Sequence, residues 1–271
     1  MSRAGLLRGA GRLAAFTPLV LLAACGGGAG GDGVEGERTL ARPAPGALVR
    51  AAAAGDTAEV RRLLAAGADV DGRTADGRTA VTAAALGDHV ATARALIDAG
   101  ADVDLQDAER NNPLLVCGET GSVAMLREVL RAKPDLTATN RFGGTALIPA
   151  SDRGHVDMVR ALLRTEIDVD HVNNLGWTAL LEAVILGEGG PPHQRIVRAL
   201  VDAGADVDLA DRDGVTPLGH ARDRGYDEIV RLLLEAGADR TIADREGITP
   251  LEHARAAGYE EIASLLETAS T

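Results

Sequence analysis

Aromatic side chains are scarce in this chain of 271 residues, which contains two Phe, two Tyr and one Trp. Nearly half of the residues (46%) are nevertheless hydrophobic, so there is enough apolar surface for a sizeable core. That core has to be built mainly from Ala, Leu, Val and Ile. Such side chains suit thin layers of short helices better than a thick globular core, so the composition favours a repeat solenoid.

Lysine is almost absent, because Lys133 is its single occurrence and the other positively charged side chains are arginines dispersed among acids. The formal net charge is −12. The sequence contains no basic stripe. This argues against nucleic acid and against anionic lipid surfaces as partners of the folded body.

The N-terminal apolar segment is too short to cross a bilayer. It covers residues 13–24, follows three arginines and ends at Cys25, whereas a spanning helix needs about 20 residues. This order is typical of an export signal. The four residues Leu22-Ala23-Ala24-Cys25 resemble the lipobox of bacterial lipoproteins, whose cysteine is lipidated and becomes the first residue of the mature chain.

We therefore expect a signal peptide over residues 1–24 and lipidation of Cys25. The protein is expected to be exported and lipid-anchored in the bacterial cell envelope, in the periplasm or at the cell surface. The alternative is an ordinary cleaved signal peptide with an incidental Cys25, which would release a soluble secreted protein. Residues 25–45 are rich in Gly and Pro and predict a tether. A lipid on Cys25 would leave Cys117 without a partner, so we expect no disulfide.

The rest of the chain, residues 46–271, is built on a repeat of 33 residues. The tripeptide Gly-Ala-Asp starts at Gly67, Gly100, Gly204 and Gly237. A helix-capping residue recurs at Thr79, Asn112, Thr145, Thr178, Thr216 and Thr249, with steps of 33 residues except for one of 38 between Thr178 and Thr216. Each is preceded five residues earlier by a polar residue, usually Asp or Asn. A short helix up to a glycine and a second helix with paired apolar residues are predicted after each cap.

These motifs, above all Asp213-Gly214-Val215-Thr216-Pro217-Leu218 followed by Gly237-Ala238-Asp239, resemble the ankyrin repeat. The resemblance implies an all-α repeat solenoid of about seven repeats, each a helix-turn-helix with a β-hairpin finger. It also implies a concave binding face made by the fingers and the first helices. Residues 140–144 and 171–177, followed by the Gly-Gly-Pro-Pro insertion, resemble a group of small bacterial ankyrin proteins of unassigned activity.

Repeats three to five depart from this pattern, which makes them the candidate functional surface. The finger tip is acidic in other repeats but is Phe142 in repeat four and Leu175 in repeat five, with Trp177 close by. Exposed apolar side chains on a rigid scaffold are typical of an interface. Alternatively, Phe142 and Trp177 pack down on adjacent fingers. The predicted partner-binding residues are Arg141, Phe142, Ile148, Asp152, His171, Asn174, Leu175, Trp177, Leu181 and Glu182.

Two backbone features of these repeats also differ. Lys133 and Glu166 stand where the other repeats have a glycine, and the following Pro134 favours an extended Lys133. Five extra residues around Glu188 to Pro192 are interpreted as a loop insertion. We expect the side chains of Leu115, Ile148 and Leu181 to form an apolar strip on the concave side, with Asp152 and Glu182 at its edges.

None of the six histidines belongs to a convincing catalytic or metal site. His89, His155, His220 and His253 recur at repeat positions and are interpreted as structural, whereas His171 and His193 are off-pattern and are candidates for ligand contact. Cys117 occupies a small core position that is Ala in other repeats. We expect no cofactor, no metal and no catalytic residue.

The sequence therefore predicts a non-enzymatic, monomeric protein-binding scaffold of the cell envelope. The alternative is an inhibitor or immunity protein that neutralises a toxic enzyme. An enzyme is the third and least favoured interpretation, because no motif carries its chemistry.

Overall fold

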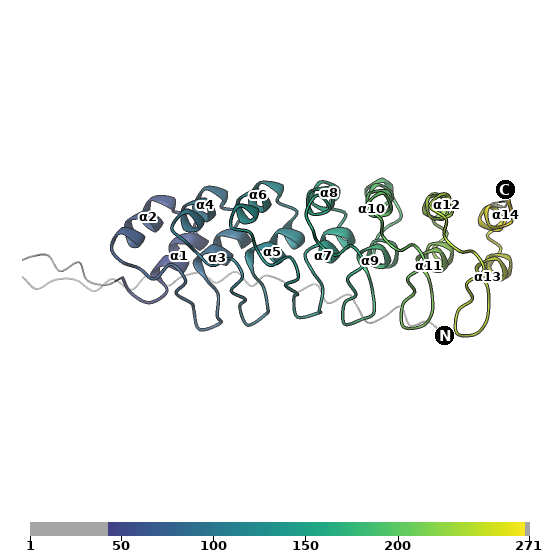
Figure 1. Ribbon diagram of the computed structural model, residues 1–271, viewed down its shortest axis with the longest axis horizontal. Helices are drawn as coiled ribbons and strands as arrows, with labels where there is room; N and C mark the ends of the chain where they lie inside the picture. The colour runs from purple at the N-terminus through teal and green to yellow at the C-terminus, as the bar shows by residue number, and fades with distance from the viewer. Residues whose placement is uncertain (1–42, 269–271) are drawn as a thin grey trace, which may run out of the picture. The chain divides into compact units, whose positions relative to one another are not determined.

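Fourteen short helices make up residues 43–268, the part of the chain that this computed structural model describes (Figure 1). They form seven pairs, each with a first, inner helix and a second, outer helix. The inner helices are α1 (Ala47–Ala53), α3 (Ala80–Leu86), α5 (Pro113–Thr120), α7 (Leu147–Asp152), α9 (Ala179–Ile185), α11 (Pro217–Asp223) and α13 (Pro250–Ala257). The outer helices are α2 (Thr57–Ala65), α4 (Val90–Asp98), α6 (Val123–Arg131), α8 (Val156–Leu162), α10 (Pro191–Asp202), α12 (Asp227–Glu235) and α14 (Glu260–Thr268). The predicted count of seven repeats is confirmed. The predicted signal peptide, Cys25 and most of the tether lie outside the described residues.

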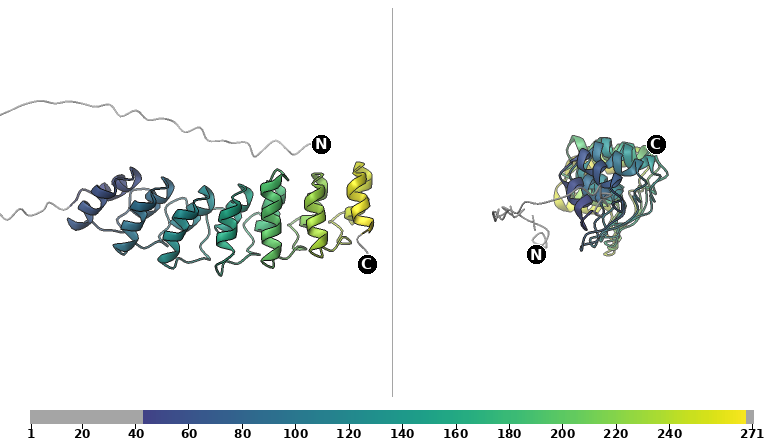
Figure 2. Two further views of the ribbon diagram at one scale, coloured as in Figure 1. Left: turned by 90° about the horizontal axis from the view of Figure 1, so that it is seen from above. Right: turned by 90° about the vertical axis from the view of Figure 1, so that its left-hand side faces the viewer.

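The helices of these repeats lie in two rows. Inner helices pack against the inner helices of neighbouring repeats, and outer helices pack against outer ones. Between the outer helix of one repeat and the inner helix of the next, the chain makes a long turn, the finger, which projects away from the outer row (Figures 1 and 2). None of the helices within residues 43–268 has both the length and the apolar character that crossing a membrane requires.

A continuous core of small aliphatic side chains runs through the row from Leu48 to Leu266. No aromatic side chain is among the buried residues of the described part, as the composition predicted. Cys117 is fully buried, like the alanines at the equivalent positions of other repeats, which confirms its assignment to the core. The whole described core belongs to one compact unit, Leu40–Thr271, so this unit contains all the packing that stabilises the described helices.

The inner helices begin where the capping pattern predicted. The side chains of Thr79, Asn112, Thr178, Thr216 and Thr249 each accept a hydrogen bond from the backbone N–H three residues later. Thr145 is the exception, because α7 begins only at Leu147 and has no side-chain cap. Pro149 explains the delay: it has no N–H to donate to the carbonyl of Thr145, which instead accepts from Ile148 at 3.3 Å.

Two backbone predictions for repeats three to five were wrong. Lys133 is left-handed, with φ +56°, rather than extended. Its N–H closes the end of the α6 turn on the carbonyl of Leu130 at 3.1 Å, and this reversal needs the left-handed conformation that Gly67 and Gly100 adopt in earlier repeats. Pro191 and Pro192 do not belong to a loop but open α10, because proline loses no hydrogen bond in the first turn of a helix.

Candidate binding surface

Each finger from repeat three onward is closed by one Asp or Asn side chain. In repeat four, Oδ1 of Asn140 accepts hydrogen bonds from the backbone N–H groups of Phe142 and Gly144 at 2.9 and 3.0 Å. The backbone N–H of Asn140 donates to the carbonyl of Gly144. The same bonds form at Asp107, Asn173, Asp211 and Asp244. Within residues 43–268 the fingers are turns rather than β-strands. The turn directs the residue two positions after the Asp or Asn outward, and this is the tip.

The two apolar tips are exposed and lie on fingers that are joined to each other. Phe142 is 54% exposed and Leu175 is 49% exposed. The N–H of Asn174 donates to the carbonyl of Phe142 at 2.9 Å, and Nε2 of His171 is 2.7 Å from the carbonyl oxygen of Gly143. The expected exposure of the tips is observed, and Phe142 does not pack down on its neighbour. Trp177 is half-buried, so it contributes less to this surface.

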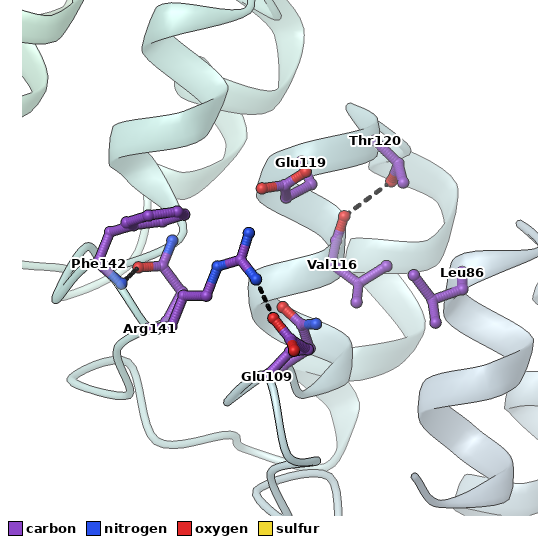
Figure 3. Close-up of a pocket in the computed structure, with 9 residues that line it drawn as sticks. Leu86, Glu109, Val116, Glu119, Thr120, Arg141 and Phe142 are labelled. Atoms are coloured by element: carbon purple, nitrogen blue, oxygen red, sulfur yellow. Dashed lines mark hydrogen bonds and ion pairs between the residues drawn. The ribbon is translucent and has the colours of Figure 1, made fainter. Parts of the chain in front are cut away.

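Arg141 links the apolar tip of repeat four to repeat three. Its guanidinium lies 4.8 Å from the centroid of the Phe142 ring and forms an ion pair with Glu109 (Figure 3). These two interactions keep the guanidinium between the ring of Phe142 and the carboxylate of Glu109.

Beside this pair lies a hollow of about 260 Å³ between the fingers and inner helices of repeats two to four (Figure 3). Arg141 and Phe142 form one wall, and the others come from residues that the sequence analysis did not select. These are Leu86, Glu109, Asn111, Val116, Glu119, Thr120 and Asn140. Leu86 is 45% exposed at the end of α3, and this position could have been noticed as an apolar residue directly before a helix-ending glycine.

The three residues predicted to form an apolar strip on this face do not reach the surface. Ile148 is 4% exposed and Leu181 is fully buried, as is nearly all of Leu115. Burial of their aliphatic surface stabilises the stack. Ile148 and Leu181 are therefore core residues, and the prediction that they contact a partner is wrong.

Glu182 is also buried rather than placed at the edge of the surface. Only 6% of it is exposed, and its carboxylate accepts a hydrogen bond from Nδ2 of Asn173 at 2.8 Å. Burial, together with the charge of Asp152, raises the pKa of Glu182 to about 7. Asp152 is half-buried, and burial raises its pKa as well.

The Asn173–Glu182 bond braces a finger against the inner helix that follows it. In the next two repeats an Asp takes the place of Asn173 and a His takes the place of Glu182. Nε2 of His220 is 2.9 Å from Oδ2 of Asp211, and Nε2 of His253 is 2.7 Å from Oδ2 of Asp244. The hydrogen bond to His253 lowers the pKa of Asp244. Glu182 thus occupies a structural position of the repeat. The sequence did not indicate this, because the equivalent residues of the next two repeats are histidines.

His193 likewise belongs to the repeat pattern and is not free to contact a ligand. It is 8% exposed in the first turn of α10, and its Nε2 lies 2.9 Å from the carbonyl oxygen of Asp152. His89 and His155 bridge to the preceding inner helix in the same way, at 3.1 Å from Ala53 and Glu119. The helical conformation of Pro191 and Pro192 keeps His193 in register despite the insertion.

The described residues hold no group of three or more His, Cys, Asp or Glu side chains placed to bind a metal ion. Cys117 is a free thiol, and burial raises its pKa far above the ordinary range. The arrangement that remains is a rigid row of fingers and inner helices that carries exposed apolar and charged side chains.

These features define a repeat solenoid with an exposed finger face, a class of scaffold whose repeats are generally protein–protein interaction modules. The family description "Ankyrin repeats (3 copies)" matches residues 48–140, 116–211 and 189–270. The chain belongs to the ankyrin-repeat family.

Known ankyrin proteins resemble the chain over different lengths. An ankyrin repeat domain from Acinetobacter baumannii AYE is 49% identical, covers 71% of this chain and 98% of its own, and superimposes with a TM-score of 0.69. The ankyrin repeat domain of Bcl-3, described as a member of the IkappaB family, is 27% identical with a TM-score of 0.73, and the match covers 82% of this chain and 97% of that domain. The putative ankyrin repeat protein YahD of Escherichia coli (strain K12) is 47% identical over 47 residues, which are 17% of this chain and 23% of that protein.

Proposed function

We propose that this protein is a non-enzymatic scaffold of the bacterial cell envelope that binds a protein partner through the fingers and inner helices of repeats three to five. The observation that carries the proposal is the pair of adjacent apolar finger tips, Phe142 and Leu175, which are about half exposed. Acidic residues occupy the tips of the other fingers from repeat two onward.

The energetics of the two tips suit an interface anchor. Burying a Phe or Leu side chain in a complex contributes roughly 1.5–3 kcal/mol relative to leaving it in water. The hydrogen bonds from Asn174 to Phe142 and from His171 to Gly143 hold the two fingers together before any partner arrives. Binding then orders few side chains, which favours affinity.

The hollow beside Phe142 extends the proposed surface toward repeat two. An apolar partner side chain placed there would contact Leu86 and Val116, while Glu119 and Thr120 at the rim offer polar contacts. A mixture of an apolar centre and a polar rim is typical of protein interfaces. Arg141 is held by Glu109 and contributes its planar guanidinium to the same wall.

Substitution of the two tips tests this proposal. The unit Leu40–Thr271 is immobilised and exposed to envelope extract, from which it should retain a specific partner protein. The double variant Phe142→Asp with Leu175→Asp should no longer retain that partner. Because both side chains are exposed, the melting temperature should change little. Ile248→Asp is the matched control, since Ile248 is 37% exposed on the finger of repeat seven. Equal loss in the control, or unchanged capture by the double variant, would contradict the proposal.

We also propose that residues 1–24 are a lipoprotein signal peptide and that a lipid on Cys25 anchors the protein. The support is the lipobox-like sequence from Leu22 to Cys25. Cells fed an alkyne-labelled fatty acid should label the protein, and Cys25→Ser should abolish the label and move the protein to the soluble fraction. Labelling that persists in Cys25→Ser would refute the anchor.

A further inference from the structure

Four exposed arginines belong to the outer-helix segments of repeats three to five. The row of outer helices lies on the side opposite the fingers (Figure 1). The four arginines are Arg127 on α6, Arg160 on α8, Arg164 just after α8, and Arg195 on α10. Along the chain, acidic residues lie between Arg127 and Arg160 and between Arg164 and Arg195, so the sequence shows no basic stripe. The alignment of successive outer helices brings them together.

Two shallow hollows connect these arginines into one basic surface, here called the arginine face. The first, of about 370 Å³, is lined by Val123, Arg127, Asp157, Arg160, Ala161 and Arg164. The second shares Arg160 and adds Arg195 and Arg198, together with two acidic residues, Asp202 and Glu228. The first hollow therefore has three positive charges and one negative charge.

The arginines of the arginine face differ from most others on the outer helices in their pairing. Arg94 forms an ion pair with Glu128, Arg131 forms ion pairs with Glu128 and Asp98, and Arg198 forms an ion pair with Glu235 at 2.9 Å. Arg127, Arg160, Arg164 and Arg195 form no ion pair with any residue between 43 and 268. In a chain with a net charge of −12, such a group of unpaired positive charges is unexpected from composition alone.

We propose that the arginine face docks the repeat body on an anionic phospholipid surface, with the lipid phosphates in the two hollows. Guanidinium groups recognise phosphate oxygens through paired N–H donors, and an arginine near an anionic surface strengthens binding by about fivefold. The choice of lipid among anionic partners rests on the proposed lipid anchor at Cys25, which would keep the body beside a membrane. Docking on this side turns the fingers away from the lipid and toward a protein partner.

Vesicle co-sedimentation tests the docking without relying on the anchor or on the partner. The unit Leu40–Thr271 lacks Cys25 and should bind vesicles of phosphatidylcholine with phosphatidylglycerol, but not phosphatidylcholine alone. Arg160→Glu with Arg164→Glu should weaken this binding by at least twentyfold, because two contributions of about fivefold are lost. High salt should abolish the binding of the unsubstituted protein.

The control carries the same change of charge on the opposite side. Arg212→Glu with Arg245→Glu alters two exposed arginines on the fingers of repeats six and seven and should leave vesicle binding within twofold, because exposed charges far from the lipid surface are screened. Melting temperatures of both double variants should match that of the unsubstituted protein, because all four side chains are exposed.

Three outcomes would overturn the proposal. The first is a lack of binding to anionic vesicles at low salt. The second is equal loss in both double variants, which would show that only net charge matters. The third is tight binding to polyglutamate or inorganic phosphate without binding to vesicles, which would assign the arginine face to another anionic partner.

Discussion

Replacement of Glu182 by glutamine should make the protein more stable at alkaline pH and leave it nearly unchanged at acidic pH. Burial raises the pKa of this carboxyl from an ordinary value of 4.5 to about 7. The folded state therefore holds a proton that the unfolded state has already released between these two values. Stability falls as the pH rises through this window, because release of the proton favours the unfolded state while the folded state still holds it.

The size of the effect follows from the same shift. A change of one pKa unit corresponds to about 1.4 kcal/mol, so the rise from 4.5 to about 7 gives an upper value of about 3.5 kcal/mol. Glutamine keeps the acceptor for Nδ2 of Asn173 but carries no charge. Asp152, whose pKa is also raised by burial, remains in the variant and keeps part of the pH dependence.

Urea unfolding followed by circular dichroism between pH 4 and pH 8.5 measures this prediction. The free energy of unfolding of Glu182→Gln minus that of the unsubstituted protein should be near zero at the acidic end and rise by about 2 kcal/mol or more at the alkaline end. Glu246→Gln, at an exposed finger tip, is the control and should show a flat difference. A flat difference for Glu182→Gln as well would refute the burial of an ionisable carboxyl at this position.

Two further predictions concern the contact between repeats three and four. A Cβ at Gly118 would lie 2.2 Å from the carbonyl oxygen of Ala146. Gly118→Ala should therefore lower the free energy of unfolding by about 2 kcal/mol, measured by urea unfolding. An unchanged midpoint of the urea transition would contradict the close approach. The buried thiol of Cys117 should not react with a thiol-specific chromogenic reagent at pH 8 in the folded protein and should react at once in denaturant; rapid reaction without denaturant would show that this core opens.

Much of the fold could be predicted because the signals of each repeat are local in the sequence. A turn-forming Asp or Asn and a capping Thr or Asn act on their own backbone neighbours, so their spacing predicts fingers and inner helices directly. The exposure of Phe142 followed from the same logic, because a finger tip points outward whatever residue occupies it. Thr145 shows the limit, since Pro149, four residues after it, delays the start of the helix to Leu147.

The errors concern contacts between repeats. Leu181 and Glu182 were placed on the surface because the sequence does not say which side of an inner helix meets the next repeat. The hollow at Phe142 takes residues from three repeats, so no single motif describes it. The arginine face is assembled in the same way from positions 127, 160 and 195, which are 33 and 35 residues apart.

Site-specific photo-crosslinking from a finger tip in living cells tests the central claim most directly. A photo-reactive amino acid placed at position 142 should form an adduct with one partner protein, whereas the same amino acid at position 213, the acidic tip of repeat six, should not. The adduct should disappear when Leu175→Asp is introduced on the adjoining finger. Absence of an adduct at position 142, or an equal adduct at position 213, would contradict the assignment of partner binding to the apolar finger tips.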